Sequence, residues 1–137
     1  MPHDPVRVED TRGWMSKAAS DLRSGSHQLL ADPPDTGDAV FHAQQAAEKA
    51  LKAFLAWHDV PFRRTRDLAD IGRACADIDE SLVALLREGA GLTQYAWRFR
   101  YPGEPEEPPL DEAQQALRLA RQVIDAIASR LPAEARP

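Results

Sequence analysis

The chain has 137 residues, of which 43% are hydrophobic, and a formal net charge of −5 at pH 7. This length suffices for one domain with one core and is short for two. The acidic balance argues against broad, charge-driven binding to nucleic acid or anionic membranes, and the single cysteine, Cys75, excludes a disulfide framework or a cysteine-based zinc site.

The first predicted helix covers residues from about 11 to 31. Hydrophobic side chains recur there at steps of three and four, although Gly25 lowers the helix propensity in the middle. Pro33 and Pro34 stop this helix. Residues 1–10 carry prolines and scattered charges without a period, so we expect a flexible N-terminal arm there.

The second predicted helix is rich in alanine and free of glycine and proline from residue 41 to 55, which gives it a high helix propensity. Asp38 is its expected N-cap, and Pro61 follows its end. One stripe of the helix is apolar and predicts a face towards the core: Val40, Ala43, Ala47, Leu51 and Phe54. A second stripe offers an imidazole, an amide and two amines: His42, Gln45, Lys49 and Lys52. Glu48 and Lys52 form an i,i+4 pair that suits a solvated surface or a role in a site.

The middle of the chain predicts shorter helical pieces. A basic connector at residues 62–66 leads into a helix that opens at Thr65 or Asp67 and runs to Ile78. Asp79 restarts the chain as a helix, which bends or breaks at residues 89–91 before it resumes for a turn or two.

Residues 101–110 hold four prolines and three glutamates, a composition typical of a loop. Asp111 is the expected cap of the last helix, with Gln114 three residues on as in a capping box, and Pro132 ends that helix. No segment alternates like a strand. We therefore expect an all-α fold, an antiparallel up-and-down four-helix bundle with an additional short helix, over residues 11–131, and a C-terminal tail at 132–137.

No N-terminal stretch resembles a signal peptide, and no apolar run reaches membrane-spanning length. The sequence therefore predicts a cytoplasmic protein without membrane contact. It contains no pattern typical of a metal site and implies no cofactor.

Two arginines and a tyrosine, Arg98, Arg100 and Tyr101, stand just before the proline-rich loop, where side chains can converge. Guanidinium groups bind phosphate or carboxylate in a fork, so these residues either contact a nucleotide or RNA phosphate or pair with acidic residues of the loop or with Glu48. With the polar stripe of the second helix they suggest a groove, for which there are six candidate residues: His42, Gln45, Lys49, Arg98, Arg100 and Tyr101.

A second basic patch consists of Arg63, Arg64 and Arg66 in the connector. Three arginines within four residues can bind phosphate. The same residues also suit a solvated loop that balances Asp67 and Asp70. Both interpretations stay open at this point.

Three sequence blocks together resemble those of a known family. The most specific is Phe-His-Ala-Gln-Gln-Ala-Ala-Glu-Lys at residues 41–49; a Tyr-x-x-Arg-x-Arg-Tyr-Pro stretch at residues 95–102 and an early helix with Trp14 and Asp21-Leu22 support it. Over about residues 11–131 the chain resembles a prokaryotic HEPN domain, named for higher eukaryotes and prokaryotes and for nucleotide binding. The resemblance implies a helical bundle, commonly a homodimer, often encoded beside a minimal nucleotidyltransferase as a toxin–antitoxin-like pair.

Many catalytic HEPN proteins are metal-independent ribonucleases that carry an Arg, four to six residues and then a His near the start of the last helix. No histidine follows Arg98 or Arg100 in this chain, whose histidines are His3, His27, His42 and His58. Arg23 and His27 have only three residues between them and lie in the first predicted helix. Arg66 stands where relatives usually carry His.

The resemblance and these departures together predict a non-catalytic partner or regulator in a nucleotidyltransferase-linked pair. His42, Lys49 and Arg100 would then line a groove for a nucleotide, an RNA phosphate or an acidic group of a partner. Two alternatives stay open: a metal-independent ribonuclease toxin with a variant active site, and a protein-interaction module that binds no nucleotide.

Overall fold

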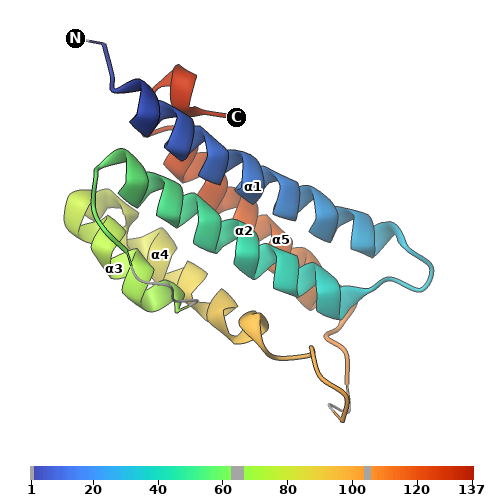
Figure 1. Cartoon of the computed structure of the whole chain (residues 1–137). Coiled ribbons are helices and arrows are strands. Elements are labelled where there is room, and N and C mark those ends of the chain that lie inside the picture. Colours follow the sequence, from blue (N-terminus) through green and yellow to red (C-terminus); the bar gives the residue numbers. More distant parts are fainter. Residues whose placement is uncertain (1, 63–66, 104–105) are drawn as a thin grey trace.

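The computed structural model describes residues 2–62, 67–103 and 106–137, and these residues form helices and connecting loops without a strand. Figure 1 shows the long helices α1, α2 and α5 lying side by side, with the short α3 and α4 on the side of α2 that faces away from α1. Helices α1 and α2 are antiparallel, α3 runs antiparallel to α4 and the 3₁₀ segment that continues it, and α5 returns to the end of the bundle where α1 begins (Figure 1). The predicted up-and-down helical bundle is therefore confirmed.

Helix α1 spans Pro5–Leu30, so it begins six residues before the expected start at 11. The Asp4 side chain caps it by accepting a hydrogen bond from the Val6 amide at 3.0 Å. Pro5, the first helical residue, has no N–H group that would need a partner. The expectation of a flexible arm is thus wrong for residues 5–10. The Asp-Pro start signal lies upstream of the clear apolar period, which is why the period alone placed the helix too late.

Helix α2 spans Thr36–Trp57 and is the central helix, in contact with α1, α3, α5 and the 3₁₀ segment. Its N-cap is Asp35, whose carboxylate accepts from the Asp38 amide at 3.2 Å, so the prediction of Asp38 as cap is wrong by one turn. The predicted apolar stripe is buried throughout. Alanines outside that stripe, Ala39, Ala46 and Ala53, are also fully buried, because small side chains let neighbouring helices approach α2 on several sides.

The middle of the chain is built from short pieces: α3 (Leu68–Ile78), the 3₁₀ turn η1 (Glu80–Leu82), α4 (Val83–Gly89) and the 3₁₀ segment η2 (Ala90–Ala96). Asp67 caps α3 through the Ala69 amide at 2.9 Å, as one of the two predicted starts requires. Asp79 caps η1. The glycine-rich stretch does not break the chain's helical course; it marks the change from α to 3₁₀ geometry.

Helix α5 spans Leu110–Ala128 and follows Pro109 without a side-chain cap. The prediction that Asp111 caps it is therefore wrong: Asp111 lies inside the first turn, where its charge still suits the positive end of the helix dipole. Beyond α5, the turn η3 (Ala133–Ala135) packs on α1, and Arg12 Nε donates to the Glu134 carbonyl at 2.8 Å. The two chain ends therefore lie at the same end of the bundle (Figure 1).

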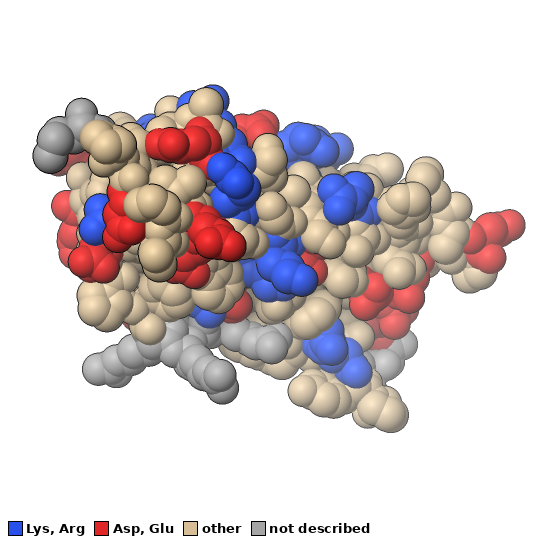
Figure 2. Space-filling model, turned by 45° about the horizontal axis from the view of Figure 1, so that its top comes forward, with Lys and Arg blue, Asp and Glu red and all other residues tan. Residues whose placement is uncertain are grey.

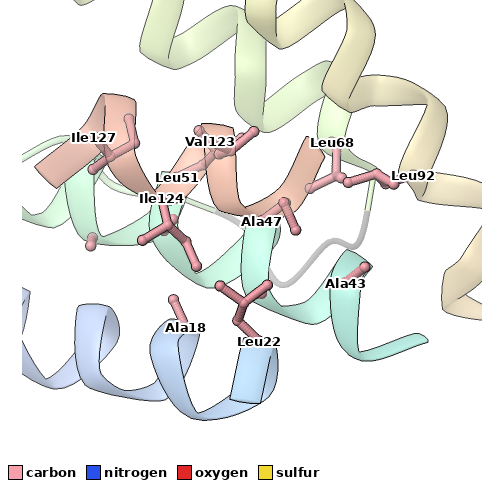
Figure 3. Packing of buried hydrophobic residues seen from close by; sticks show 14 of the residues in the cluster. Ala18, Leu22, Ala43, Ala47, Leu51, Leu68, Leu92, Val123, Ile124 and Ile127 are labelled. Atoms are coloured by element: carbon pink, nitrogen blue, oxygen red, sulfur yellow. The ribbon is translucent and has the colours of Figure 1, made fainter. Parts of the chain in front are cut away.

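The core fills the space that α2 shares with its neighbours. Figure 3 shows Leu22 of α1 directed towards α2 and α5, while Leu68 and Leu92 meet on the side of α3 and η2. The predicted apolar stripe of α5 contributes Val123, Ile124 and Ile127 to the same cluster. None of the helices in the described part of the chain is long and apolar enough to cross a membrane.

Candidate functional site

One carboxylate on α1, that of Asp21, receives two side chains from α2. His42 Nδ1 lies 2.9 Å from Asp21 Oδ1, and Lys49 Nζ pairs with Asp21 Oδ2. His42 and Lys49 are seven residues apart, so they project from the same face of α2 two turns apart, and the carboxylate sits between them. The Asp21 side chain is only 13% exposed, so this pairing takes place at the α1–α2 seam and not in open solvent.

The imidazole of His42 is held from both sides. Its Nε2 lies 3.3 Å from Asp38 Oδ2, one turn earlier on α2. Carboxylates only accept hydrogen bonds, so the ring donates to Asp21 and Asp38 together only in its protonated form. Two carboxylates thus face one imidazole ring and one ammonium group. We call these four residues, Asp21, Asp38, His42 and Lys49, the Asp21 cluster.

The other half of the polar stripe is buried deeper. Lys52 Nζ lies 3.4 Å from Glu48 Oε2, and both side chains are at most 10% exposed. The same ammonium lies 5.6 Å from the ring centroid of Trp14 and 5.7 Å from that of Phe62, distances at which a cation is attracted to an aromatic face. This pair therefore lies in the interior and not on a solvated surface.

Gln45, one of the predicted groove residues, belongs to this buried set. Its amide donates to Gln44 Oε1 at 2.7 Å, and Gln44 in turn donates to Glu48 Oε1 at 3.2 Å. Buried polar groups are stable when they are hydrogen-bonded to one another in this way. Gln45 thus contributes to a side-chain network along α2.

The loop that follows η2 carries exposed arginine and aromatic side chains. The Arg100 guanidinium carbon lies 3.4 Å from the centroid of the Phe41 ring, which is itself edge-to-face with the His42 ring at 5.8 Å. Arg98 turns back on its own segment and donates to Gln94 Oε1 at 2.6 Å. Tyr101 is 65% exposed. Among the described residues no carboxylate forms an ion pair with Arg98 or Arg100.

The predicted site residues therefore fall into three groups. His42 and Lys49 come together through Asp21, and Arg100 reaches their neighbourhood by stacking on Phe41. Gln45 is turned into the interior, while Arg98 and Tyr101 lie on the loop. The secondary basic patch of Arg63, Arg64 and Arg66 lies outside the described residues.

Asp21 and Asp38 are the cluster members that the sequence did not single out as site residues. Both were visible, Asp38 as a supposed helix cap and Asp21 inside a supporting block. A single sequence does not determine the register of one helix against another. The contact of Asp21 with His42 and Lys49 could therefore not be predicted from local sequence.

The groups with the largest pKa shifts lie in the packing and not in this cluster. Burial raises the pKa of the Cys75 thiol to about 12, and its Sγ donates to the Leu51 carbonyl at 3.6 Å. Burial and the Glu112 carboxylate together raise the pKa of Tyr95 to about 12. In the described ranges no group of three or more His, Cys, Asp and Glu side chains is placed to hold a metal ion.

The family resemblance carried by the sequence blocks is confirmed over almost the whole chain. The family model described as HEPN domain matches residues 11–131. No curated protein and no solved structure shows significant similarity to the chain. The match includes the Asp21 cluster, the loop with Arg100 and the core stripes of α2 and α5. With most of its length matched, and with an all-helical bundle in the residues that the structure describes, the chain belongs to the HEPN domain family.

Proposed function

We propose that this HEPN domain is a non-catalytic, homodimeric partner that binds and regulates a minimal nucleotidyltransferase in a toxin–antitoxin-like pair. The observation that carries the proposal is the Asp21 cluster. The side chains that could move protons, those of His42 and Lys49, are held by the carboxylates of Asp21 and Asp38.

Cleavage of RNA without a metal requires one group to take the 2′-hydroxyl proton, one to protonate the leaving oxygen and a cation for the phosphorane. Arginine supplies only the cation, because it stays protonated. His42 is the imidazole beside the proposed groove, and both of its nitrogens face carboxylates at 2.9 and 3.3 Å. Acting as a base would require the ring to leave at least one of these carboxylates. The network therefore favours binding over acid–base chemistry.

The neighbouring loop supports a role in binding. Arg100 lays its guanidinium on Phe41 and has no carboxylate partner among the described residues, so its N–H groups are free to reach an acidic group of a partner. Trp97 and Tyr101 beside it are 54% and 65% exposed. Aromatic and arginine side chains of this kind are enriched at the centres of protein interfaces.

Co-expression with a minimal nucleotidyltransferase, which the proposal expects to be encoded beside this chain, tests the proposal. We expect the two proteins to co-purify, and Arg100→Ala to weaken the complex by about tenfold or more, as truncation of a central arginine does at other interfaces. Arg87→Ala is the matched control, because Arg87 is an exposed arginine on α4. Failure of the unaltered proteins to associate, or equal losses in the two variants, would overturn the assignment.

A further inference from the structure

The α1–α5 side of the bundle contains a hollow that plays no part in the proposed function. It has a volume of about 370 Å³ and lies between Arg23 and His27 of α1 and Arg121 of α5. Leu22 and Ile124 form its apolar floor and are almost fully buried. Volumes of this size are typical of sites for small organic ligands.

The basic side chains around this hollow lack acidic partners in the part of the chain that the structure describes. Other arginines are engaged: Arg130 Nε, for example, lies 2.7 Å from Asp79 Oδ2. Asp21, on the same helix as Arg23, is turned towards α2, and Asp125, one turn after Arg121, forms no ion pair with it in the described ranges. Cationic groups thus gather without compensation on a chain whose net charge is −5.

The wider surface fits this local arrangement. Figure 2, in which the top of the Figure 1 view is turned forward, shows basic side chains spread over the middle of that face and acidic side chains mainly towards its two ends. A basic centre with acidic ends attracts a small anion to one region of an otherwise acidic protein.

The chemistry of the walls selects the ligand. Guanidinium groups present planar forks of N–H donors that match phosphate oxygens. Arginines on two facing helices carry two positive charges, which balance a phosphomonoester dianion, and His27 adds a third charge when it is protonated. Inorganic phosphate alone would make no favourable contact with the apolar floor, whereas an organic group attached to the phosphate could pack on it.

We propose that the hollow between α1 and α5 binds a small phosphomonoester, with its phosphate between Arg23 and Arg121 and its organic part on Leu22 and Ile124. The site is separate from the Asp21 cluster and does not depend on the function proposed for that cluster. It would bind its ligand whether or not the protein associates with a nucleotidyltransferase.

Calorimetric titration of the full chain with phenyl phosphate, inorganic phosphate and phenol tests this inference. We expect saturable binding of phenyl phosphate that is about fivefold or more tighter than that of inorganic phosphate, because the phenyl group buries apolar area, and no binding of phenol. Arg23→Gln and Arg121→Gln should each weaken phenyl phosphate binding by about tenfold or more, as expected for the loss of hydrogen bonds to a charged group. Arg23→Lys should restore only part of the affinity, since it returns the charge without the fork.

Arg118→Gln is the matched control. This substitution removes one positive charge from α5, the helix that carries Arg121. Arg118, however, donates a hydrogen bond to Gln115 and lines a different hollow. The substitution should change the affinity by less than about twofold. Circular dichroism of each variant checks that the fold is intact. Absence of saturable binding, equal affinity for phosphate and phenyl phosphate, or an equal loss in Arg118→Gln and Arg23→Gln would overturn the proposal.

Discussion

At Gly25, α1 packs tightly against α2 and α5, and replacing this glycine by alanine tests the packing that brings Asp21 to α2. A Cβ atom at this position would lie 2.7 Å from Leu117 Cδ2 on α5 and 3.2 Å from both the Ala39 carbonyl oxygen and His42 Cβ on α2. The leucine methyl group can rotate away. The carbonyl and the Cβ are fixed to the α2 backbone, so α1 would have to move outward.

Two effects of Gly25→Ala oppose each other. Alanine is favoured over glycine inside a helix by about 1 kcal/mol, whereas forcing an extra methyl group into a packed contact costs about 1–3 kcal/mol. We therefore expect a net loss of about 1 kcal/mol in the free energy of unfolding. Gly13→Ala, in the same helix, is the matched control. No atom lies within 4 Å of its added Cβ, so only the propensity gain of about 0.5–1 kcal/mol remains.

Urea unfolding followed by far-ultraviolet circular dichroism measures both variants against the unaltered chain. We expect changes of opposite sign in the free energy of unfolding, with Gly13→Ala more stable and Gly25→Ala less stable than the parent. Stabilisation by both substitutions to the same extent would show that α1 and α2 are farther apart at Gly25. The pairing of His42 with Asp21 would then lose its structural basis.

Three further predictions concern single side chains. Asp21→Asn should lower the unfolding free energy by about 1–2 kcal/mol, since it removes the charge that pairs with a histidine and a lysine of α2. The control Asp10→Asn, at an exposed position, should change it by no more than about 0.5 kcal/mol. Equal effects of the two substitutions would contradict the pairing of Asp21 with α2. Because burial raises the pKa of Cys75 to about 12, a disulfide reagent should label it fully in denaturant and only slowly in the native protein at neutral pH, so rapid native labelling would show an open core. Hydrogen bonds from Ser81 and then Arg130 lower the pKa of Asp79 from 3.8, so the ionised carboxylate stabilises the fold above that pH, and this contribution is lost as the pH falls through the lower native pKa. The difference in unfolding free energy between the parent and Asp79→Asn should therefore shrink on acidification below about pH 4. A difference that stays constant with pH would refute this explanation.

The sequence predicted the helices and the core stripes because these follow from local periodicity. Every residue of the apolar stripe predicted for α2 is buried. Helix starts were harder, since several side chains compete for each cap: Asp35 and not Asp38 caps α2, and α5 starts after Pro109 without help from Asp111. An Asp-Pro pair already starts α1 at Pro5, ahead of the apolar repeat.

The candidate site was predicted only in part, because half of it depends on how the helices meet. The spacing of the residues predicted the polar stripe of α2. It did not predict that much of this stripe is buried, because α2 is covered by neighbouring helices on more sides than an amphipathic surface helix is. Asp21 joins the site only through the register of α1 against α2. The hollow with Arg23 and Arg121 brings together residues about a hundred positions apart in the chain, and no sequence pattern connects them.

Incubation of the purified protein with total RNA, in the presence of a metal chelator, shows whether the Asp21 cluster takes part in nuclease chemistry. In the proposed function the Asp21 cluster serves structure and binding and carries no nuclease chemistry. We expect the RNA to stay intact with the unaltered chain. Cleavage that is abolished by both His42→Ala and Arg100→Ala, and retained in the control His58→Ala, would contradict the proposal.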